Sequence, residues 1–131
     1  MMRVYQQVRL FSGFIMHELS LAMSVKEIVE DAAAQNGSAK VNAVNIAVGE
    51  FSSVSIDVLE FAMEVAKKDT CFENAEIIIK SIKTVLVCEE CNSESVMEDF
   101  VFKCSACGSG KVIITAGDRM YVESIDIELK E

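Results

Sequence analysis

Four cysteines in two C-x-x-C pairs are the residues of this sequence best suited to hold a metal ion. Cys88 and Cys91 form the first pair, and Cys104 and Cys107 form the second pair after the intervening residues 92–103. Two residues between cysteines allow a tight turn to present both sulfurs to one ion, as in four-thiolate zinc sites. Gly108 then allows the backbone to turn away with a positive φ. The spacing predicts a zinc site made of these four cysteines.

Two other chemistries use the same four sulfurs. Two disulfides fit poorly with pairs this regular in a chain that has no recognisable export signal. A rubredoxin-like iron site has the same ligand set, and it would colour the purified protein, whereas zinc would leave it colourless. The fifth cysteine, Cys71, has no second histidine available to activate it as a nucleophile. We expect it to be a small buried residue at a junction between a helix and a strand.

His17 is the only histidine of the chain, and it follows Met16, a second candidate start residue. If the mature chain begins at Met16, a free amine, the imidazole and the backbone nitrogens between them can form fused chelate rings around one metal. Deprotonated amide nitrogens favour square-planar Ni(II) or Cu(II). Because binding would displace protons, affinity should fall with acidification. The alternative is an ordinary surface histidine at the entry to a helix.

The composition indicates a folded protein of one domain, or one domain with a small insert. Of its 131 residues, 51% are hydrophobic and 25% are charged, which excludes disordered and fibrous classes. The 12 basic and 21 acidic residues give a net charge of −9. Nucleic acids and anionic membranes bind basic surfaces, so this charge argues against both as partners. Five cysteines without an export signal predict a reducing, cytoplasmic location.

Periodicity predicts an α+β fold in which a small mixed β-sheet and two helices carry a zinc-ribbon insert. Residues 19–35 and 56–66 have helical spacing, and Ser55 is suited to cap the second helix. We predict strands at 41–48, at 75–87 and near the C-terminus, where the apolar residues Ile125, Ile127 and Leu129 alternate with polar ones. Within the insert, residues 96–103 and 111–114 are expected to pair as short strands, and the metal must supply most of the local stability.

This order of elements predicts three parts. Residues 1–15 are expected to be an extension or a start-site artefact, and the alternative is an edge strand from Val4 to Phe11. Residues 16–87 and 117–131 should form an α/β domain, because the last strand needs the core of the first sheet. Residues 88–116 should form the zinc-binding domain, an excursion from the α/β domain rather than a terminal appendage.

Several segments outside the cysteines match one known family. They are the start Met16-His17-Glu18, the stretch Val48-Gly49-Glu50 followed by serines, the segment from Ile113 to Gly117, and the final Ser-Ile-Asp-Ile-Glu strand. Together with the two cysteine pairs, these residues resemble the HypA/HybF family of hydrogenase-maturation nickel chaperones. The resemblance runs from Met16 to the C-terminus, which is 116 of the 131 residues.

The resemblance implies a nickel metallochaperone and not an enzyme. It implies that His17 is the principal nickel ligand, with the amine of Met16 and the backbone nitrogen of Glu18 beside it, while the four cysteines hold structural zinc. It also implies delivery of Ni(II) to the large subunit of [NiFe]-hydrogenase. In some organisms such proteins also serve urease maturation, with urease accessory proteins as further partners. A HypB-type GTPase is the implied partner. Separately, a long strand that leads into a metal-stapled insert could exchange between chains, so the sequence is compatible with a monomer or a homodimer.

This chain departs from the family pattern at three places. Residues before Met16 place its nitrogen in a peptide bond, which removes the amine that the nickel site needs. Ser105 stands in the second cysteine pair where many relatives carry proline, which should soften that turn without removing a ligand. Some relatives recruit an acidic side chain before the second helix, where this chain offers Ser55 and then Asp57.

A zinc-ribbon adaptor that recognises nucleic acid or a transcription partner is the alternative function. Between Cys88 and Cys107 there is one basic residue, Lys103, against five acidic ones: Glu89, Glu90, Glu94, Glu98 and Asp99. Because affinity for nucleic acid depends on neutralising phosphates, this balance disfavours the alternative.

Overall fold

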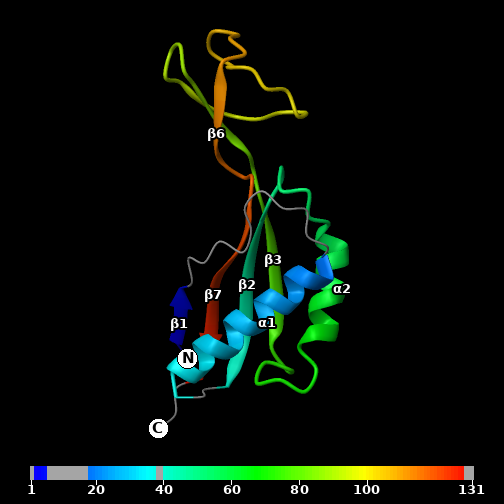
Figure 1. The fold of residues 1–131 in the computed structure, drawn as a ribbon. Coiled ribbons are helices and arrows are strands. Elements are labelled where there is room, and N and C mark those ends of the chain that lie inside the picture. Colours follow the sequence, from blue (N-terminus) through cyan, green and yellow to red (C-terminus); the bar gives the residue numbers. More distant parts are fainter. Residues whose placement is uncertain (1, 6–17, 38–39, 129–131) are drawn as a thin grey trace.

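A computed structural model describes residues 2–5, 18–37 and 40–128 of the chain. The molecule is elongated, with two helices and a larger sheet at one end and a smaller sheet at the other (Figure 1). Within these residues, neither helix is long and apolar enough to cross a membrane. The α+β fold with two helices and a four-cysteine ribbon, predicted from the sequence, is confirmed.

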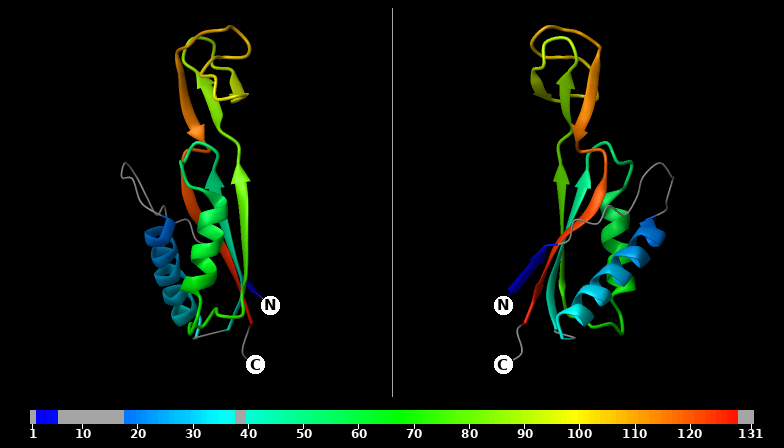
Figure 2. Two further views of the ribbon diagram at one scale, coloured as in Figure 1. Left: turned by 90° about the vertical axis from the view of Figure 1, so that its right-hand side faces the viewer. Right: turned by 60° about the vertical axis from the view of Figure 1, so that its left-hand side comes forward.

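The larger sheet has four strands in the order β1-β7-β2-β3, and both helices cover one of its faces (Figure 2). We call this part the helix-covered region. Strands β2 and β3 are parallel because α2 connects them across that face, whereas β7 is antiparallel to β2 and β1. Its elements are β1 (Met2–Tyr5), α1 (Glu18–Gln35), β2 (Val41–Gly49), α2 (Ile56–Ala66), β3 (Glu76–Ile82) and β7 (Met120–Ile127).

An apolar core between the helices and the sheet holds this region together. The helical spacing predicted from the sequence places one face of each helix against the sheet, as in Leu21 and Leu59, both fully buried. Ser55 caps α2 as predicted, since its side chain accepts a hydrogen bond from the nitrogen of Val58. Further fully buried core residues are Val25, Val29, Val44, Ile46, Met63, Phe72, Met120, Val122, Ile125 and Ile127.

The smaller sheet has three strands in the order β5-β4-β6, and both outer strands are antiparallel to β4. The strands are β4 (Val85–Cys88), β5 (Glu94–Val96) and β6 (Val112–Ala116). We call residues 85–116 the four-cysteine region. It begins at Val85, so β4 belongs to the smaller sheet, although the sequence placed these residues in the long strand before the insert.

Two strand predictions are wrong in this part of the chain. The long strand predicted at 75–87 is two strands, because the chain leaves the larger sheet after Ile82 and enters the smaller one at Val85. The predicted pairing of 96–103 with 111–114 does not form. The first cysteine pair reverses the chain directly after β4, so β5 returns along β4, and β6 takes the other side of the same strand. Residues 97–103 form no strand.

The two regions meet where the loop after β2 is hydrogen-bonded to the end of β3 and to the segment between β6 and β7. The nitrogen of Glu50 donates to the oxygen of Ile82, and the nitrogen of Phe51 donates to the oxygen of Gly117, both at 2.8 Å. Gly117 has a φ of +85°, and a Cβ at Gly49 would lie 2.3 Å from the Gly117 oxygen. This close approach requires glycine at both positions.

Residues 2–5 form an additional edge strand, β1, beside β7. The sequence had favoured an extension or start-site artefact for residues 1–15, with an edge strand from Val4 to Phe11 as the alternative. The observed strand begins earlier, at Met2, and ends at Tyr5. Residues 6–11 of the alternative lie outside the described part of the chain.

Candidate metal centre

The structure brings the four predicted cysteines together at the tip of the smaller sheet. Their sulfur atoms all lie within 4.8 Å of one another. The Sγ atoms of Cys88 and Cys107 are 3.6 Å apart, and those of Cys91 and Cys104 are 3.5 Å apart. Sulfurs at about 2.3 Å from a tetrahedral zinc ion lie about 3.8 Å from one another. The four thiols therefore fit a single tetrahedral ion of this size.

The two cysteine pairs sit in turns of the same construction. In the first, the nitrogen of Asn92 donates to the oxygen of Cys88, and in the second, Gly108 donates to Cys104, both at 2.9 Å. Asn92 and Gly108 occupy equivalent positions and have φ values of 61° and 75°. Asparagine and glycine tolerate this left-handed conformation best. The sequence indicated this role for Gly108, and Asn92 plays the same part, which sequence reasoning missed.

Backbone amides inside each turn point at the sulfurs. The nitrogens of Glu90 and Ala106 each lie 3.4 Å from a sulfur, on Cys88 and Cys104 respectively. Such N–H donors favour the thiolate form and orient it. The side chains of Cys88 and Cys104 are buried, whereas Cys91 and Cys107 are exposed. The centre therefore has an inner and an outer ligand from each turn.

The electrostatics of the cluster favour a bound cation. Hydrogen bonds with Ser93 and then with the neighbouring thiols lower the pKa of Cys91 to about 6. For Cys107, a backbone hydrogen bond with Ser109 acts in the same direction, but hydrogen bonds with Cys88 and burial outweigh it and raise the pKa to about 12. One thiolate can thus be shared among the thiols, whereas four adjacent thiolates need a metal ion to neutralise them.

The centre has the closed donor set of a structural site. Four protein sulfurs complete a tetrahedron and leave no position for a substrate. Beneath the cysteines, the smaller sheet buries only a few apolar side chains, among them Leu86 and Met97. A metal bound by these cysteines would cross-link β4 to the loop before β6. No layer of apolar side chains otherwise holds that loop in place.

Of the three predicted nickel ligands, only Glu18 lies within the described residues. Met16 and His17 are outside the described residues, and Glu18 is the first residue of α1. The Glu18 Oε1 atom accepts a hydrogen bond of 2.9 Å from the nitrogen of Ser55, the residue that caps α2. Sequence reasoning missed this contact, because 37 residues separate its partners and only the packing of α1 against α2 joins them.

Two further candidates from the sequence have clear positions. Asp57, considered as an acidic ligand, is exposed in the first turn of α2, two residues after Ser55. Cys71 lies in the turns between α2 and β3, as predicted, but it is exposed rather than buried. Partial burial of the thiol and the charge of Glu30 raise its pKa, which disfavours a reactive thiolate.

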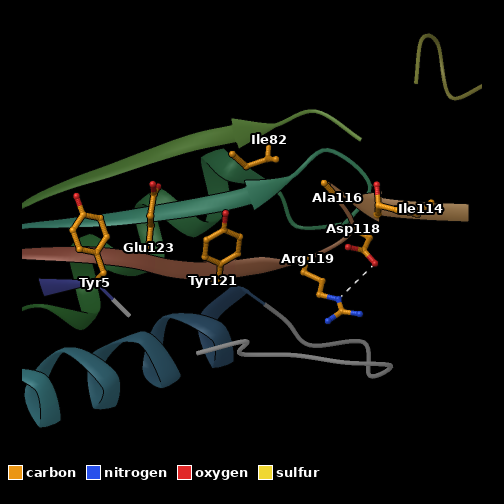
Figure 3. A pocket seen from close by; sticks show the side chains of 10 residues that line it. Tyr5, Ile82, Ile114, Ala116, Asp118, Arg119, Tyr121 and Glu123 are labelled. Atoms are coloured by element: carbon orange, nitrogen blue, oxygen red, sulfur yellow. Dashed lines mark ion pairs between the residues drawn. The ribbon is translucent and has the colours of Figure 1, made fainter. Parts of the chain in front are cut away.

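A separate open cavity of about 520 Å³ lies on the sheet face that the helices leave uncovered. Tyr5, Tyr121 and Glu123 stand on one side of the sheet in this cavity (Figure 3). Ile82 and the segment from Ile114 to Arg119 complete its wall, and Arg119 is paired with Asp118 at 3.6 Å. None of the four cysteines lines it, so it is independent of the metal centre.

The fold and the centre define a class of small metal-binding protein, in which a helix-covered α/β region carries a four-cysteine ribbon. The chain belongs to the HypA family, whose model, "Hydrogenase/urease nickel incorporation, metallochaperone, hypA", matches residues 16–127. The family resemblance noted in the sequence is thereby confirmed.

Individual relatives agree with the family match. The hydrogenase maturation factor HypA of Chlorobaculum tepidum is 38% identical over 113 residues, which are 86% of this chain and 100% of that protein. The corresponding protein of Desulfatibacillum aliphaticivorans is also 38% identical over 113 residues, which are 86% of this chain and 87% of that protein. The solution structure of the Ni metallochaperone HypA from Helicobacter pylori matches with a TM-score of 0.67 at 26% identity, covering 88% of this chain and 100% of the other.

Proposed function

We propose that this protein is a nickel metallochaperone that delivers Ni(II) for the maturation of [NiFe]-hydrogenase. One observation carries the proposal: the family match begins at Met16, so the segment Met16-His17-Glu18 opens a domain that also carries the four-cysteine cluster. The relatives named above are hydrogenase maturation factors, and the family description adds urease. Delivery to urease is a second route that we include in the proposal.

The nickel site of this proposal is formed by His17, Met16 and Glu18. The His17 imidazole, the Met16 amine and backbone nitrogens would give the planar nitrogen set that Ni(II) prefers. The contact between Glu18 and Ser55 supports this location, because it fixes the start of α1 beside the N-terminus of α2. The metal would then be bound on an element whose position the core determines.

Zinc at the four cysteines is the structural part of the proposal. The sulfur spacing and the closed donor set support ligation by Cys88, Cys91, Cys104 and Cys107. On this basis we divide the chain into an extension at 1–15, a nickel-binding α/β domain at 16–87 and 117–131, and a zinc-binding domain at 88–116. The smaller sheet also takes in residues 85–87 from the α/β segment.

A HypB-type GTPase and the hydrogenase large subunit are the proposed partners, in the cytoplasm. A protein that delivers nickel needs a protein to receive it, and the family description names nickel incorporation into hydrogenase and urease. None of the five cysteines forms a disulfide, which suits a reducing compartment. The acidic chain, with its net charge of −9, favours protein partners over nucleic acid.

Nickel titration of three zinc-loaded proteins tests the function. They are the chain from Met1, the chain from Met16, and the Met16 chain with His17→Ala. Loading zinc first removes the cysteines from competition for nickel. We expect one planar, diamagnetic Ni(II) per Met16 chain. Binding should fall at least tenfold with His17→Ala and should also be weaker in the chain from Met1, where the Met16 nitrogen is an amide.

Equal nickel affinity in all three proteins would exclude the N-terminal site. If nickel bound only after zinc was removed, the nickel site would be at the cysteines, and the proposal of separate nickel and zinc sites would be wrong. If the first titration succeeds, mixing the nickel-loaded Met16 chain with an apo hydrogenase large subunit and measuring the nickel content of the re-isolated subunit tests delivery.

A further inference from the structure

The outer edge of β7 is covered by a strand that lies outside the family match. Strand β1 (Met2–Tyr5) pairs with Ser124–Ile127 of β7, whereas the family model begins at residue 16. Among the described residues of the matched range 16–127, the larger sheet consists of β7, β2 and β3, and β7 is its edge. An unpaired edge presents a row of backbone donors and acceptors to any extended chain.

A two-point ion pair fixes the register of β1 on this edge. The Nε atom of Arg3 donates to Oδ1 of Asp126 at 2.6 Å, and its terminal nitrogen donates to Oδ2 at 3.2 Å. Asp126 is only 7% exposed. The guanidinium of Arg3 holds the pKa of this carboxyl below its usual range. Such a forked contact is specific for arginine, because a lysine cannot make two parallel bonds.

The opposite face of β1 is apolar and faces the core. Met2 and Val4 are half-buried and pack against the core residues, whereas Arg3 and Tyr5 lie on the uncovered side of the sheet. The edge of β7 is therefore complementary to a short strand in which one arginine stands between two apolar residues. Backbone pairing would supply affinity, and these alternate side chains would supply specificity.

The β7 edge lacks most of the features that prevent strands from pairing with another chain. The segment Ser124–Ile127 contains no lysine and no proline, and its register with β1 is regular. The register shifts of β7 are all on the side of β2. The one such feature in this segment is Asp126, an acidic side chain that disfavours pairing with a strand that has no basic residue opposite it. Asp126 therefore favours a strand with an arginine at that position.

We propose that the β7 edge is a binding site for an extended segment of another protein, in which an arginine is flanked by two apolar residues. Residues 2–5 of this chain occupy the site as an intramolecular competitor. A strand of four residues makes few hydrogen bonds, so its occupancy depends on the covalent link through residues 6–17. The net charge of −9 adds long-range attraction for a basic segment.

A peptide corresponding to residues 1–8 of this chain is the probe, measured by fluorescence anisotropy against the full-length protein and its Arg3→Glu variant. In that variant two carboxylates face each other, and β1 should leave the edge. We expect the Arg3→Glu protein to bind the peptide at least tenfold more tightly than the unaltered protein. A peptide that itself carries Arg3→Glu should bind at least tenfold more weakly, and the control variant Arg119→Glu should behave like the unaltered protein.

Hydrogen exchange provides a second measurement that does not depend on the peptide. The amides of residues 124–127 that face β1 should exchange at least tenfold faster in Arg3→Glu, and adding the peptide should restore their protection. Equal peptide binding by all variants, or equal binding of both peptides, would overturn the proposal. A concentration-dependent doubling of mass in the full-length protein would show exchange of β1 between two copies and would overturn the intramolecular assignment.

Discussion

The helix-covered region and the four-cysteine region are stabilised by different forces. The helix-covered region places two helices on one face of a four-stranded sheet and buries a continuous apolar core. The four-cysteine region has no helix among its described residues, and its three-stranded sheet has no second layer. Hydrophobic burial can fold the first region, whereas the second needs another source of stability.

The exposed side chains of the four-cysteine region show the same contrast. Five large apolar side chains are exposed there: Val96, Phe100, Val101, Phe102 and Ile113. Two of them are covered in part by the other region, since Phe51 contacts the rings of Phe100 and Phe102 at centroid distances of 6.4 and 5.2 Å. The position of the four-cysteine region relative to the helix-covered region thus depends on a few contacts, and the proposed metal would supply its internal order.

Removing one of the proposed zinc ligands should have the largest effect on this contrast. Structural zinc contributes binding free energy on the order of 10 kcal/mol to small domains. We expect Cys104→Ser to lose stoichiometric zinc and to broaden or collapse the amide signals of residues 85–116 in a two-dimensional NMR spectrum. Signals from α1, α2 and β2 should keep their dispersion.

The matched control for this change is Cys71→Ser, which alters a cysteine outside the cluster. It should retain one zinc per chain and an unchanged spectrum apart from its neighbours. Stoichiometric zinc in Cys104→Ser would contradict four-thiolate ligation. Collapse of the helical signals would show that the helix-covered region depends on the metal as well.

A cavity in the helix-covered region should have the next largest effect, and in the opposite part of the molecule. Leu59 is fully buried on α2, and Leu→Ala changes in such positions cost about 3 kcal/mol. We expect Leu59→Ala to lower the unfolding midpoint in urea, followed by circular dichroism of the helices. Zinc content of the folded protein should not change.

Phe61 provides the control on the same helix, because it is 73% exposed. Phe61→Ala should change the free energy of unfolding by less than about 0.5 kcal/mol. If the two variants lost equal stability, the buried face of α2 would not be the one the structure assigns.

Apart from β1 and the end of β3, the helix-covered region could be predicted from the sequence because its elements have clear local signals. The apolar spacing of α1 and the Ser55 cap of α2 fix both helices, and alternation fixes β2 and the last strand. Two contacts had no such signal. The ion pair of Arg3 with Asp126 and the bond from Ser55 to Glu18 join residues far apart in sequence. Only the packed fold brings these partners together.

The grouping of the four cysteines was predictable, whereas the strands of their region were not. Cysteine spacing predicts such a cluster directly, since a four-thiolate centre needs only four sulfurs and two turns. Strand pairing in this region is determined by the turns rather than by an apolar pattern. The β-rich sequence from 75 to 87 therefore gave no signal for the break between β3 and β4 at Lys83 and Thr84. The exposed position of Cys71 likewise had no signal, because a cysteine in a turn has no periodicity to place it.

The junction between the regions should give the smallest of these effects, and it tests whether the regions are mechanically joined. Gly117 has a φ of +85°, and a Cβ there would lie 2.5 Å from the backbone oxygen of Lys83. We expect Gly117→Ala to cost about 2 kcal/mol in unfolding free energy, because an alanine there would have a strained backbone conformation and a steric clash with Lys83.

Gly110→Ala is the control, since a Cβ at Gly110 meets nothing within 4 Å. Zinc should stay bound in both variants, while Gly117→Ala should shift the NMR signals of Phe51 and Phe100 as the two regions move apart. Unchanged stability and unchanged Phe signals in Gly117→Ala would show that the chain passes this point without the close contact, and that the two regions are joined only by their connecting strands.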